Sequence, residues 1–486
     1  MTDAVETQHD ATTEPGIDPI PWAVPAPDAA AFTATIARQA TLTKPAGALG
    51  RLEPLSAWIA AVQGTCPPRP FTRPLLVILA GDHGVARAAG TSAYPPEVTA
   101  QMVVNFVTGG AGANVLARQV GATVRVVDVS VDADPGYLDA FDPQVASRRV
   151  RRSCGSVDRE PAMTVAEAVA SIRLGADLAD EARADGADLL VPGDMGIGNT
   201  TAAAALTGLL TGRAADDVTG RGTGIDDATL ARKRAAVAQA MDRGRPAVDD
   251  PVALLAEVGS PDIAAMSGML ARAAALGLPV VLDGVISCAA ALVSRRIAPG
   301  ADAWWVAGHR STEPAHILAL QQLNLEPIVD LGLRLGEGTG AAVALPLVRA
   351  AVATLASMAE EEKLAHDVYV TLGGTFSDLP QFDRIARAES QHLTTMRALL
   401  DRYGIADPTS GRAVGDFADP ELRALYTSLV ERADTPADAL GVGVTIERLD
   451  IADLDDAMSG LTAPDVLNAY THLRQGSQRH LAAFGG

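Results

Sequence analysis

Leu75–Ala80 reads LLVILA, and Gly81–Val85, which follows directly, reads GDHGV. The first stretch is apolar without interruption, which is typical of a strand that is buried on both faces of a parallel sheet. The second stretch is polar and flanked by glycines, as expected of the turn at the carboxyl end of such a strand, where α/β proteins bind their ligands. Together the two stretches predict a parallel sheet with a functional edge.

The same arrangement of an apolar run and a polar or glycine-rich turn recurs along the chain. The further runs are Val124–Val131, Asp188–Val191, Pro279–Leu282 and the strand-like unit Trp304–Ser311. Helical stretches separate these runs. The alternation of strands and helices predicts a doubly wound α/β domain with a mainly parallel sheet and a small helical subdomain, and it gathers the turns along one edge of the sheet.

Two glycine-dense turns are candidates for binding an anion. Gly193–Thr201 (GDMGIGNTT) leads from a strand into an Ala-rich helix, and the free N–H groups at such a helix start can cradle a phosphate. Gly220–Asp227 (GRGTGIDD) precedes a helix that carries Lys233. The first turn matches neither the P-loop nor the dinucleotide fingerprint, so a tight structural turn and a solvated lysine stay open as alternatives.

A single carboxylate stands between glycines in Leu333–Gly340, which reads LRLGEGTG. The apolar run Ala341–Leu345 that follows is typical of a buried helix, so we expect Glu337 at a loop-to-helix junction. A carboxylate that is partly desolvated there would have a raised pKa and could act as a base near neutral pH. The alternative is an exposed loop glutamate, which is the commoner situation for a lone charged residue.

Length and composition narrow the class of protein. The chain has 486 residues, which predicts two or three domains, and its net charge of −20 argues against a nucleic-acid partner. Three cysteines stand far apart without metal-binding spacing, as in a reducing cytosol. The acidic N-terminus has no signal-peptide pattern, and no run reaches the roughly 18 apolar residues of a membrane helix. We therefore expect a cytoplasmic protein without a membrane partner, and a disordered tail over residues 1–28.

Eight stretches occur in a fixed order between about residues 30 and 357: TKPAGALGRLE, AGDHGV, SAYPPEVTAQMVVNF, GDMGIGNTTAAAAL, GRGTGIDD, VVLDGVISCAAAL, GHRSTEP and LGLRLGEGTGAA. Together they resemble the nicotinate-nucleotide:dimethylbenzimidazole phosphoribosyltransferase family of cobalamin lower-ligand assembly. The resemblance implies an enzyme domain over residues 29–357. This domain would transfer phosphoribose from nicotinate mononucleotide to 5,6-dimethylbenzimidazole and release α-ribazole 5′-phosphate and nicotinate. It also implies small-molecule substrates, no cofactor or metal for this reaction, and a homodimer.

The resemblance further implies roles for individual residues. Glu337 would be the general base that removes the benzimidazole N–H proton, and Asp194 stands where the family often carries a second acid, frequently the longer glutamate. The positions that line the base pocket in the family correspond to Tyr94, Gln101, Met195 and Leu335. The positions that hold the phosphate and ribose correspond to Gly196, Lys233, Gly284 and Ser311.

The region after Met358 has little strand signal and holds four of the eight histidines. Glu389 and His392 form a Glu-x-x-His pair, and residues three apart share one face of a helix. Carboxylates and imidazoles that come from four expected helices give the pattern of a di-metal bundle. They are Glu362, Glu389, His392, Glu447 and His480.

This region, about residues 358–484, resembles a little-characterised family of prokaryotic ferritin-like domains. The resemblance implies an all-α four-helix bundle over residues 358–486, with iron or manganese as possible metals. The second Glu-x-x-His of a di-iron site is Ser477-x-x-His480 here, so one carboxylate is missing unless Asp450 or Glu361 supplies it. Two metal ions, a single ion and an empty bundle therefore stay open.

The sequence as a whole predicts a fusion of the transferase with the bundle, joined by one long helix over Leu347–Thr371. A different class of function is a sensor, in which the α/β domain holds an azole or nucleotide without turnover and the bundle reports iron or oxygen. The presence of both Glu337 and Lys233 speaks against it. A third hypothesis is that the bundle supplies or protects the azole, because making a benzimidazole ring requires oxidative chemistry.

Overall fold

The structure is a computed structural model that describes residues 22–39, 47–402, 411–417, 420–458 and 464–486. Its centre is a six-stranded sheet in the order β2-β1-β3-β4-β5-β6, in which each pair of neighbouring strands is parallel. The strands are β1 (Pro74–Gly81), β2 (Thr123–Ser130), β3 (Leu189–Met195), β4 (Val280–Leu282), β5 (Trp305–His309) and β6 (Pro327–Val329).

Strand β1 makes the longest pairings of the sheet. It pairs with β2 from Leu75↔Thr123 onward and with β3 from Pro74↔Leu189 onward. All eight residues of β1 are buried. A strand that is covered on both faces can use only apolar side chains, which explains its uninterrupted apolar run.

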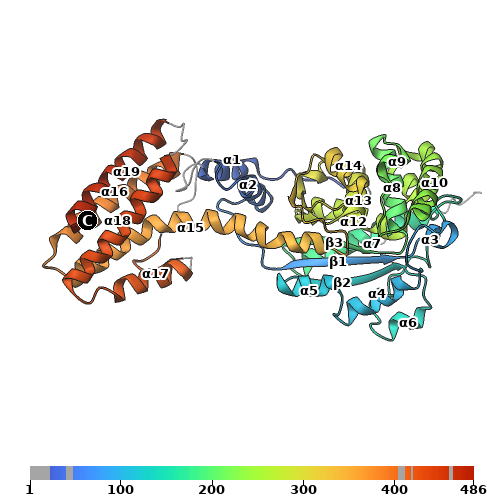
Figure 1. The fold of residues 1–486 in the computed structure, drawn as a ribbon, viewed down its shortest axis with the longest axis horizontal. Coiled ribbons are helices and arrows are strands. Elements are labelled where there is room, and N and C mark those ends of the chain that lie inside the picture. Colours follow the sequence, from blue (N-terminus) through green and yellow to red (C-terminus); the bar gives the residue numbers. More distant parts are fainter. Residues whose placement is uncertain (1–21, 40–46, 403–410, 418–419, 459–463) are drawn as a thin grey trace, which may run out of the picture.

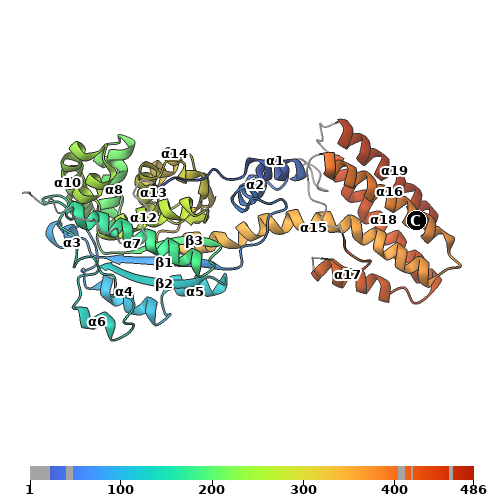
Figure 2. The same cartoon turned by 180° about the vertical axis from the view of Figure 1, so that it is seen from behind.

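Helices cover both faces of the sheet (Figures 1 and 2). The chain moves from β1 to β2 on one side and then to β3 on the other, and right-handed crossovers place the connecting helices on opposite faces. Helices α4 and α5 pack against β2, whereas α12 packs against β1, β2, β3 and α7. The helices up to this point are α1 (Ala29–Gln39), α2 (Leu52–Gln63), α3 (Gly84–Ala89), α4 (Val98–Val107), α5 (Gly112–Gln119), α6 (Pro135–Asp139), α7 (Val165–Ala184), α8 (Asn199–Thr211), α9 (Ala215–Val218), α10 (Asp227–Gly244), α11 (Pro251–Val258), α12 (Pro261–Ala275), α13 (Val285–Ile297) and α14 (Pro314–Leu323).

One helix, α15 (Thr339–Thr375), runs from the sheet to the C-terminal helices (Figure 1). Its 37 residues span about 55 Å at 1.5 Å per residue. It packs against β3, β5 and β6 and also contacts α16, α17 and α18. We call the end of α15 together with the following helices the C-terminal helical region: α16 (Pro380–Arg402), α17 (Pro420–Glu431), α18 (Pro436–Met458) and α19 (Pro464–Phe484).

The described side chains form separate hydrophobic cores around the sheet and in the C-terminal helical region. The start of α15 contributes Ala341 and Val352 to the first core, and its end contributes Tyr369 to the second. There the centroid of the Tyr369 ring lies 6.2 Å from that of Phe382 and 5.4 Å from that of Phe484. The shared helix therefore belongs to both cores.

The predicted strands are confirmed, with boundaries that shift by a few residues. The shared helix is also confirmed and extends beyond Leu347–Thr371 at both ends. Strand β6 was not predicted from the sequence, because it has only three half-buried residues and begins with Pro327. Proline cannot donate to a strand ladder, so it normally argues against a strand.

The folded part of the chain begins before Ala29, which corrects the predicted disordered tail over residues 1–28. Residues 1–21 of the predicted tail lie outside the described residues, but Trp22 is only 4% exposed. Nε1 of Trp304 also donates a hydrogen bond of 2.9 Å to the carbonyl oxygen of Pro25. These contacts fix residues before Ala29 to the core. Across the described ranges, no helix has the length and apolar character needed to cross a membrane.

Candidate active site

A cavity of about 440 Å³ opens at the carboxyl edge of the sheet. Its walls come from the turns after β3, β4 and β5, from the loop before α4 and from the loop before α15. The first turns of α8 and α13 also line it, and their N–H groups have no partner within the helix. This volume is in the range of small-molecule sites, and the location is the one expected for an open parallel sheet.

Glu337 lies at the wall of this cavity on a tightly turned backbone. Gly336, Glu337 and Gly338 have φ angles of 79°, 61° and 80°, and α15 begins directly after them. A non-glycine residue at such a φ is strained, and strain of this kind clusters at functional sites. The loop also packs closely on β3, since a Cβ atom at Gly193 would lie 2.9 Å from the Glu337 carbonyl oxygen.

The Glu337 carboxyl group is buried, and no cation is among the described groups that shift its pKa. The residue is 5% exposed, and its Oε2 has no hydrogen-bond partner among the described residues. Burial raises the pKa of Glu337 to about 7, and the nearby Asp283 carboxylate adds to the rise, while the Ala113 N–H partly offsets it. A carboxylate with this pKa can accept a proton near neutral pH.

Asp283, which follows β4, fixes the start of α15 and therefore the position of Glu337. Its carboxylate accepts hydrogen bonds from the N–H groups of Gly338 (3.1 Å), Gly340 (2.8 Å) and Ala341 (3.1 Å). A carboxylate at this place satisfies the free N–H groups of the first turn and the positive end of the helix dipole. Gly340 is required here, because a Cβ atom would come within 2.0 Å of the His309 ring.

Asp194 lies at the end of β3 on another part of the cavity wall. It is 7% exposed; its Oδ2 accepts a hydrogen bond of 3.2 Å from Asn199, and its Oδ1 has no such partner in the described part of the chain. Burial raises the pKa of Asp194 well above its usual value, and the neighbouring Asp262 raises it further, whereas His83 opposes the rise.

Lys233 supplies a cation to the cavity from α10. It is 1% exposed, and its Nζ donates hydrogen bonds to Thr200 Oγ1 (2.8 Å) and to the Gly220 carbonyl oxygen (3.0 Å). Burial lowers the pKa of Lys233 to about 8, although Glu313 opposes this change. Together with the first turn of α8, the ammonium group creates a favourable place for an anion.

The structure brings all the predicted transferase residues except Gln101 to this cavity: Tyr94, Asp194, Met195, Gly196, Lys233, Gly284, Ser311, Leu335 and Glu337. Gln101 is exposed and does not contribute to the cavity wall. Val98 and Met102 lie one helical turn apart and face the cavity. Because successive residues of a helix differ by about 100°, Gln101 points to a different side than Met102.

Several polar residues of the site were missed by the sequence analysis. Asp283, Asn199, Thr200 and Glu313 line the cavity, and Asp262 lies beneath it beside Asp194. Asp283 and Asn199 stood inside quoted turns and could have been found from their position after a strand or at a helix start. Asp262 gave no such signal, because its partner His83 is 179 residues away along the chain.

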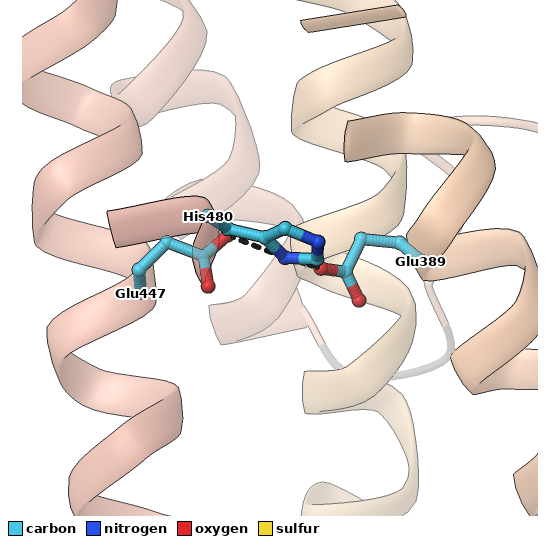
Figure 3. Close-up of side chains that lie close together, drawn as sticks. All are labelled: Glu389, Glu447 and His480. Atoms are coloured by element: carbon cyan, nitrogen blue, oxygen red, sulfur yellow. Dashed lines mark ion pairs between the residues drawn. The ribbon is translucent and has the colours of Figure 1, made fainter. Parts of the chain in front are cut away.

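A second cluster of titratable side chains lies in the C-terminal helical region (Figure 3). Glu389 on α16, Glu447 on α18 and His480 on α19 point toward one another, with ligand atoms within 4.8 Å. Nδ1 of His480 lies 2.8 Å from Glu389 Oε1 and 3.5 Å from Glu447 Oε1. Nδ1 of His392 lies 2.8 Å from the other oxygen of Glu389.

Neighbouring groups set the charges of this second cluster. Burial opposes ionisation of Glu389, but the His392 and His480 imidazoles outweigh it and lower the pKa of Glu389 to about 2. Burial raises the pKa of Asp450 to about 7, although the Ser477 hydroxyl donates a hydrogen bond to it. The side chains of the predicted ligand Glu362 and of Glu361 lie outside the described residues.

Comparison with known proteins divides the chain at α15. Residues 24–364 match the phosphoribosyltransferase family, and residues 352–485 match an uncharacterized protein domain (DUF2202). The nicotinate-nucleotide–dimethylbenzimidazole phosphoribosyltransferase of Mycobacterium avium is 58% identical over 333 residues, which is 68% of this chain and 94% of that protein. The protein of the same name from Mycobacterium tuberculosis is 58% identical over 336 residues, which is 69% of this chain and 91% of that protein.

A solved structure extends the similarity to the fold. The crystal structure of CobT from Thermus thermophilus superimposes with a TM-score of 0.63 at 44% sequence identity and covers 67% of this chain and 96% of that one. Because the family match spans more than half of the chain and includes the cavity, the protein belongs to the phosphoribosyltransferase family and carries an uncharacterized helical domain behind its enzyme region.

Proposed function

We propose that the α/β part of the chain transfers phosphoribose from nicotinate mononucleotide to 5,6-dimethylbenzimidazole. The names of the relatives at 58% identity support these substrates. The observation that carries the proposal is the buried Glu337 carboxyl group, which has a free oxygen and a pKa of about 7 in a cavity that also holds a cation. A binding protein without turnover has no need for a strained, desolvated base.

The proposed reaction needs one proton acceptor. Glu337 takes the N–H proton of the benzimidazole, and the freed nitrogen forms a bond to C1′ of the ribose. The bond between C1′ and the pyridinium nitrogen breaks, and its electron pair stays on nicotinate, which leaves with a neutral ring nitrogen. The proton passes from Glu337 to solvent. The products are α-ribazole 5′-phosphate and nicotinate, and the main task of the protein is to hold both substrates in line.

The walls of the cavity suit these two substrates. Apolar side chains of Met102, Met195 and Leu335 border a region in which a flat aromatic ring would lie, with Tyr94 at its rim. Lys233 and the N–H groups at the start of α8 would hold the phosphate. One polar group at the reacting edge of an otherwise apolar slot is the usual design for such a ligand.

The direct test is release of nicotinate from nicotinate mononucleotide when 5,6-dimethylbenzimidazole is added to the full chain. We expect release that depends on the azole and forms one α-ribazole 5′-phosphate per nicotinate. Tight binding of both compounds without release would contradict the proposal and favour the sensor alternative.

We also propose that the C-terminal helical region is a ferritin-like four-helix bundle that binds iron or manganese at Glu389, Glu447 and His480. Carboxylates combined with imidazole suit both metals. The three side chains offer two carboxylates and one imidazole whose ligand atoms lie within 4.8 Å of one another. An ion bound there would take the place of the proton on Nδ1 of His480. Iron bound there would supply oxygen or redox chemistry.

A proton on His480 is the competing explanation for this cluster, because an imidazolium between two carboxylates also satisfies the charges. The described ligands suffice for one ion, and a second ion would need His392, Asp450 and Glu362. The measurement is the metal content of the full chain after removal of metal and reloading with Fe(II) or Mn(II). We expect one ion per chain, which is lost in His480→Gln and kept in His472→Gln, an exposed histidine of the same helix.

The outcome of that measurement decides between the alternatives. A chain that never retains iron or manganese would contradict the metal site and leave the ion pair as the reason for the cluster. Two ions per chain would contradict the single site and restore the di-metal pattern. Such a result would also revive the hypothesis that the bundle supplies or protects the azole.

We further propose that the chain divides into domains at 29–357 and 358–486 and that it forms a homodimer. The two separate hydrophobic cores support the division. Phe32 and Ile36 support a protein contact, since both are more than 40% exposed and lie one turn apart on α1. Sedimentation of the full chain at twice its mass of 50.0 kDa would agree with the dimer, and a monomer would contradict it.

A further inference from the structure

Three buried titratable groups that the proposed reaction does not use as a base meet beneath the cavity. His83 follows β1, Asp262 is in the first turn of α12, and Asp194 is the last residue but one of β3. The side chains of His83 and Asp262 are fully shielded from solvent, and Nε2 of His83 lies 3.2 Å from Asp262 Oδ2. Asp194 alone reaches the cavity wall.

The glycines around this group hold the three elements close together. A Cβ atom at Gly196 would lie 2.1 Å from the Gly81 carbonyl oxygen and 3.2 Å from the His83 ring. A Cβ atom at Gly81 would come within 2.8 Å of Asp262 Oδ1. The turn that carries Asp194 is therefore packed directly on the pair formed by His83 and Asp262.

The charges of this group do not balance if both carboxyl groups are ionised. Asp262 balances the positive charge of His83, so His83 does not balance an ionised Asp194 as well. The groups that face Asp194 are Asp262 from α12, His83 from the turn after β1, and the neutral Asn199 amide from α8. Two adjacent buried carboxylates with one cation retain a proton between them. The raised pKa of Asp194 agrees with one proton retained by the two carboxyl groups.

We propose that His83 and Asp262 are positioning residues that keep a proton on Asp194, so that Asp194 meets the substrates as a neutral hydrogen-bond donor and Glu337 alone serves as the base. This inference rests on the proposed function of the cavity. The pyridinium nitrogen needs no proton to leave, so Asp194 is not a general acid. Its hydroxyl donates to an oxygen acceptor of the mononucleotide, and its neutrality avoids repulsion of the phosphate and carboxylate of that substrate.

Infrared spectroscopy of the full chain without substrates tests the protonation directly. In the Glu337→Gln background at neutral pH, we expect a carbonyl band of a protonated carboxylic acid that disappears on Asp194→Asn substitution. The same band should titrate at a lower pH in Asp262→Asn, because the negative neighbour is gone. Absence of a difference between Glu337→Gln and its Asp194→Asn double variant would overturn the inference, whether or not the protein turns over the proposed substrates.

Kinetics provides the second measurement. Asparagine keeps a neutral donor, so Asp194→Asn should retain kcat within about tenfold of the wild type and leave the pH profile of kcat/KM unchanged. Asp194→Leu, which has no donor, should raise KM for the mononucleotide by a larger factor. Asp216→Asn is a control at an exposed carboxylate. An Asp194→Asn variant as inactive as Glu337→Gln would show that Asp194 must ionise and would contradict the inference.

Discussion

Glu337 and Glu389 are both buried glutamates, 5% and 7% exposed, and yet their surroundings push their pKa values in opposite directions. Glu337 faces a second carboxylate, Asp283, and has one free oxygen. Glu389 lies between the imidazoles of His392 and His480. Burial alone therefore does not determine what a carboxylate does. A buried carboxylate without a cation is available as a base and lowers stability, whereas one between imidazoles stabilises the fold or holds a metal.

The largest expected effect is on turnover in Glu337→Gln. The amide has the same shape but cannot accept a proton, so kcat should fall on the order of 10²- to 10⁴-fold, as for the loss of other positioned bases. Single-turnover formation of α-ribazole 5′-phosphate measures the chemical step. Glu326→Gln, an exposed glutamate that pairs with Arg51, is the matched control and should keep wild-type activity. A near wild-type kcat in Glu337→Gln would remove the basis for the comparison.

The next effect concerns the stability of the C-terminal helical region. Glu389→Gln leaves the buried imidazole of His480 and the half-buried imidazole of His392 without their shared counter-charge, and breaking a buried pair in this way costs about 3–5 kcal/mol. The measurement is denaturant unfolding of metal-stripped full-length chain, followed by hydrogen exchange in α16 and α19. Glu431→Gln, at the exposed end of α17, is the control. An unchanged midpoint would mean that Glu389 is not a stabilising partner.

The third effect is a gain in stability when Glu337 is substituted, in contrast to the loss expected for Glu389→Gln, and this gain depends on pH. The pKa of Glu337 rises from 4.5 to about 7 on folding, so the folded state binds the proton more tightly between these values. Stability of the α/β part should therefore fall as the pH rises through this window, and above pH 7 the buried charge costs on the order of 3 kcal/mol. Glu337→Gln should remove this cost.

Hydrogen exchange in β1 and β3 can measure that difference. At pH 8 the Glu337→Gln variant should be more stable than the wild type, and below about pH 4.5 the two should match. A variant that is less stable at pH 8 would show that the Glu337 carboxylate has a stabilising partner, which contradicts the free oxygen on which the base assignment depends.

Local patterns in the sequence were sufficient to predict much of this arrangement. The continuous apolar run of β1 predicted a buried parallel strand, and the glycines around Glu337 predicted its place before α15. Contacts between distant parts of the chain were not predictable in this way. Asp262 meets His83 and Asp194 only because α12 packs beneath the ends of β1 and β3. Similarly, the orientation of Gln101 depends on how α4 docks, which the motif around it does not encode.

The smallest expected effect tests whether the two glutamates are independent. Glu389→Gln should change kcat/KM of the transferase by less than about twofold, because local opening of a structure is confined to cooperative units. Asp283 caps the start of α15, and Ala341, Leu345, Val348 and Val352 of this helix lie in the core around the sheet. Pro346 lacks the N–H that would bond to the carbonyl group one turn earlier, so the hydrogen-bond ladder of α15 is already interrupted between Glu337 and the second core. Loosening at the far end of the helix should therefore stop before it reaches the cavity.

A tenfold change in kcat/KM below the unfolding transition would show that α15 transmits the state of the C-terminal helical region to Glu337, and the two carboxylates would then have to be treated as one coupled system.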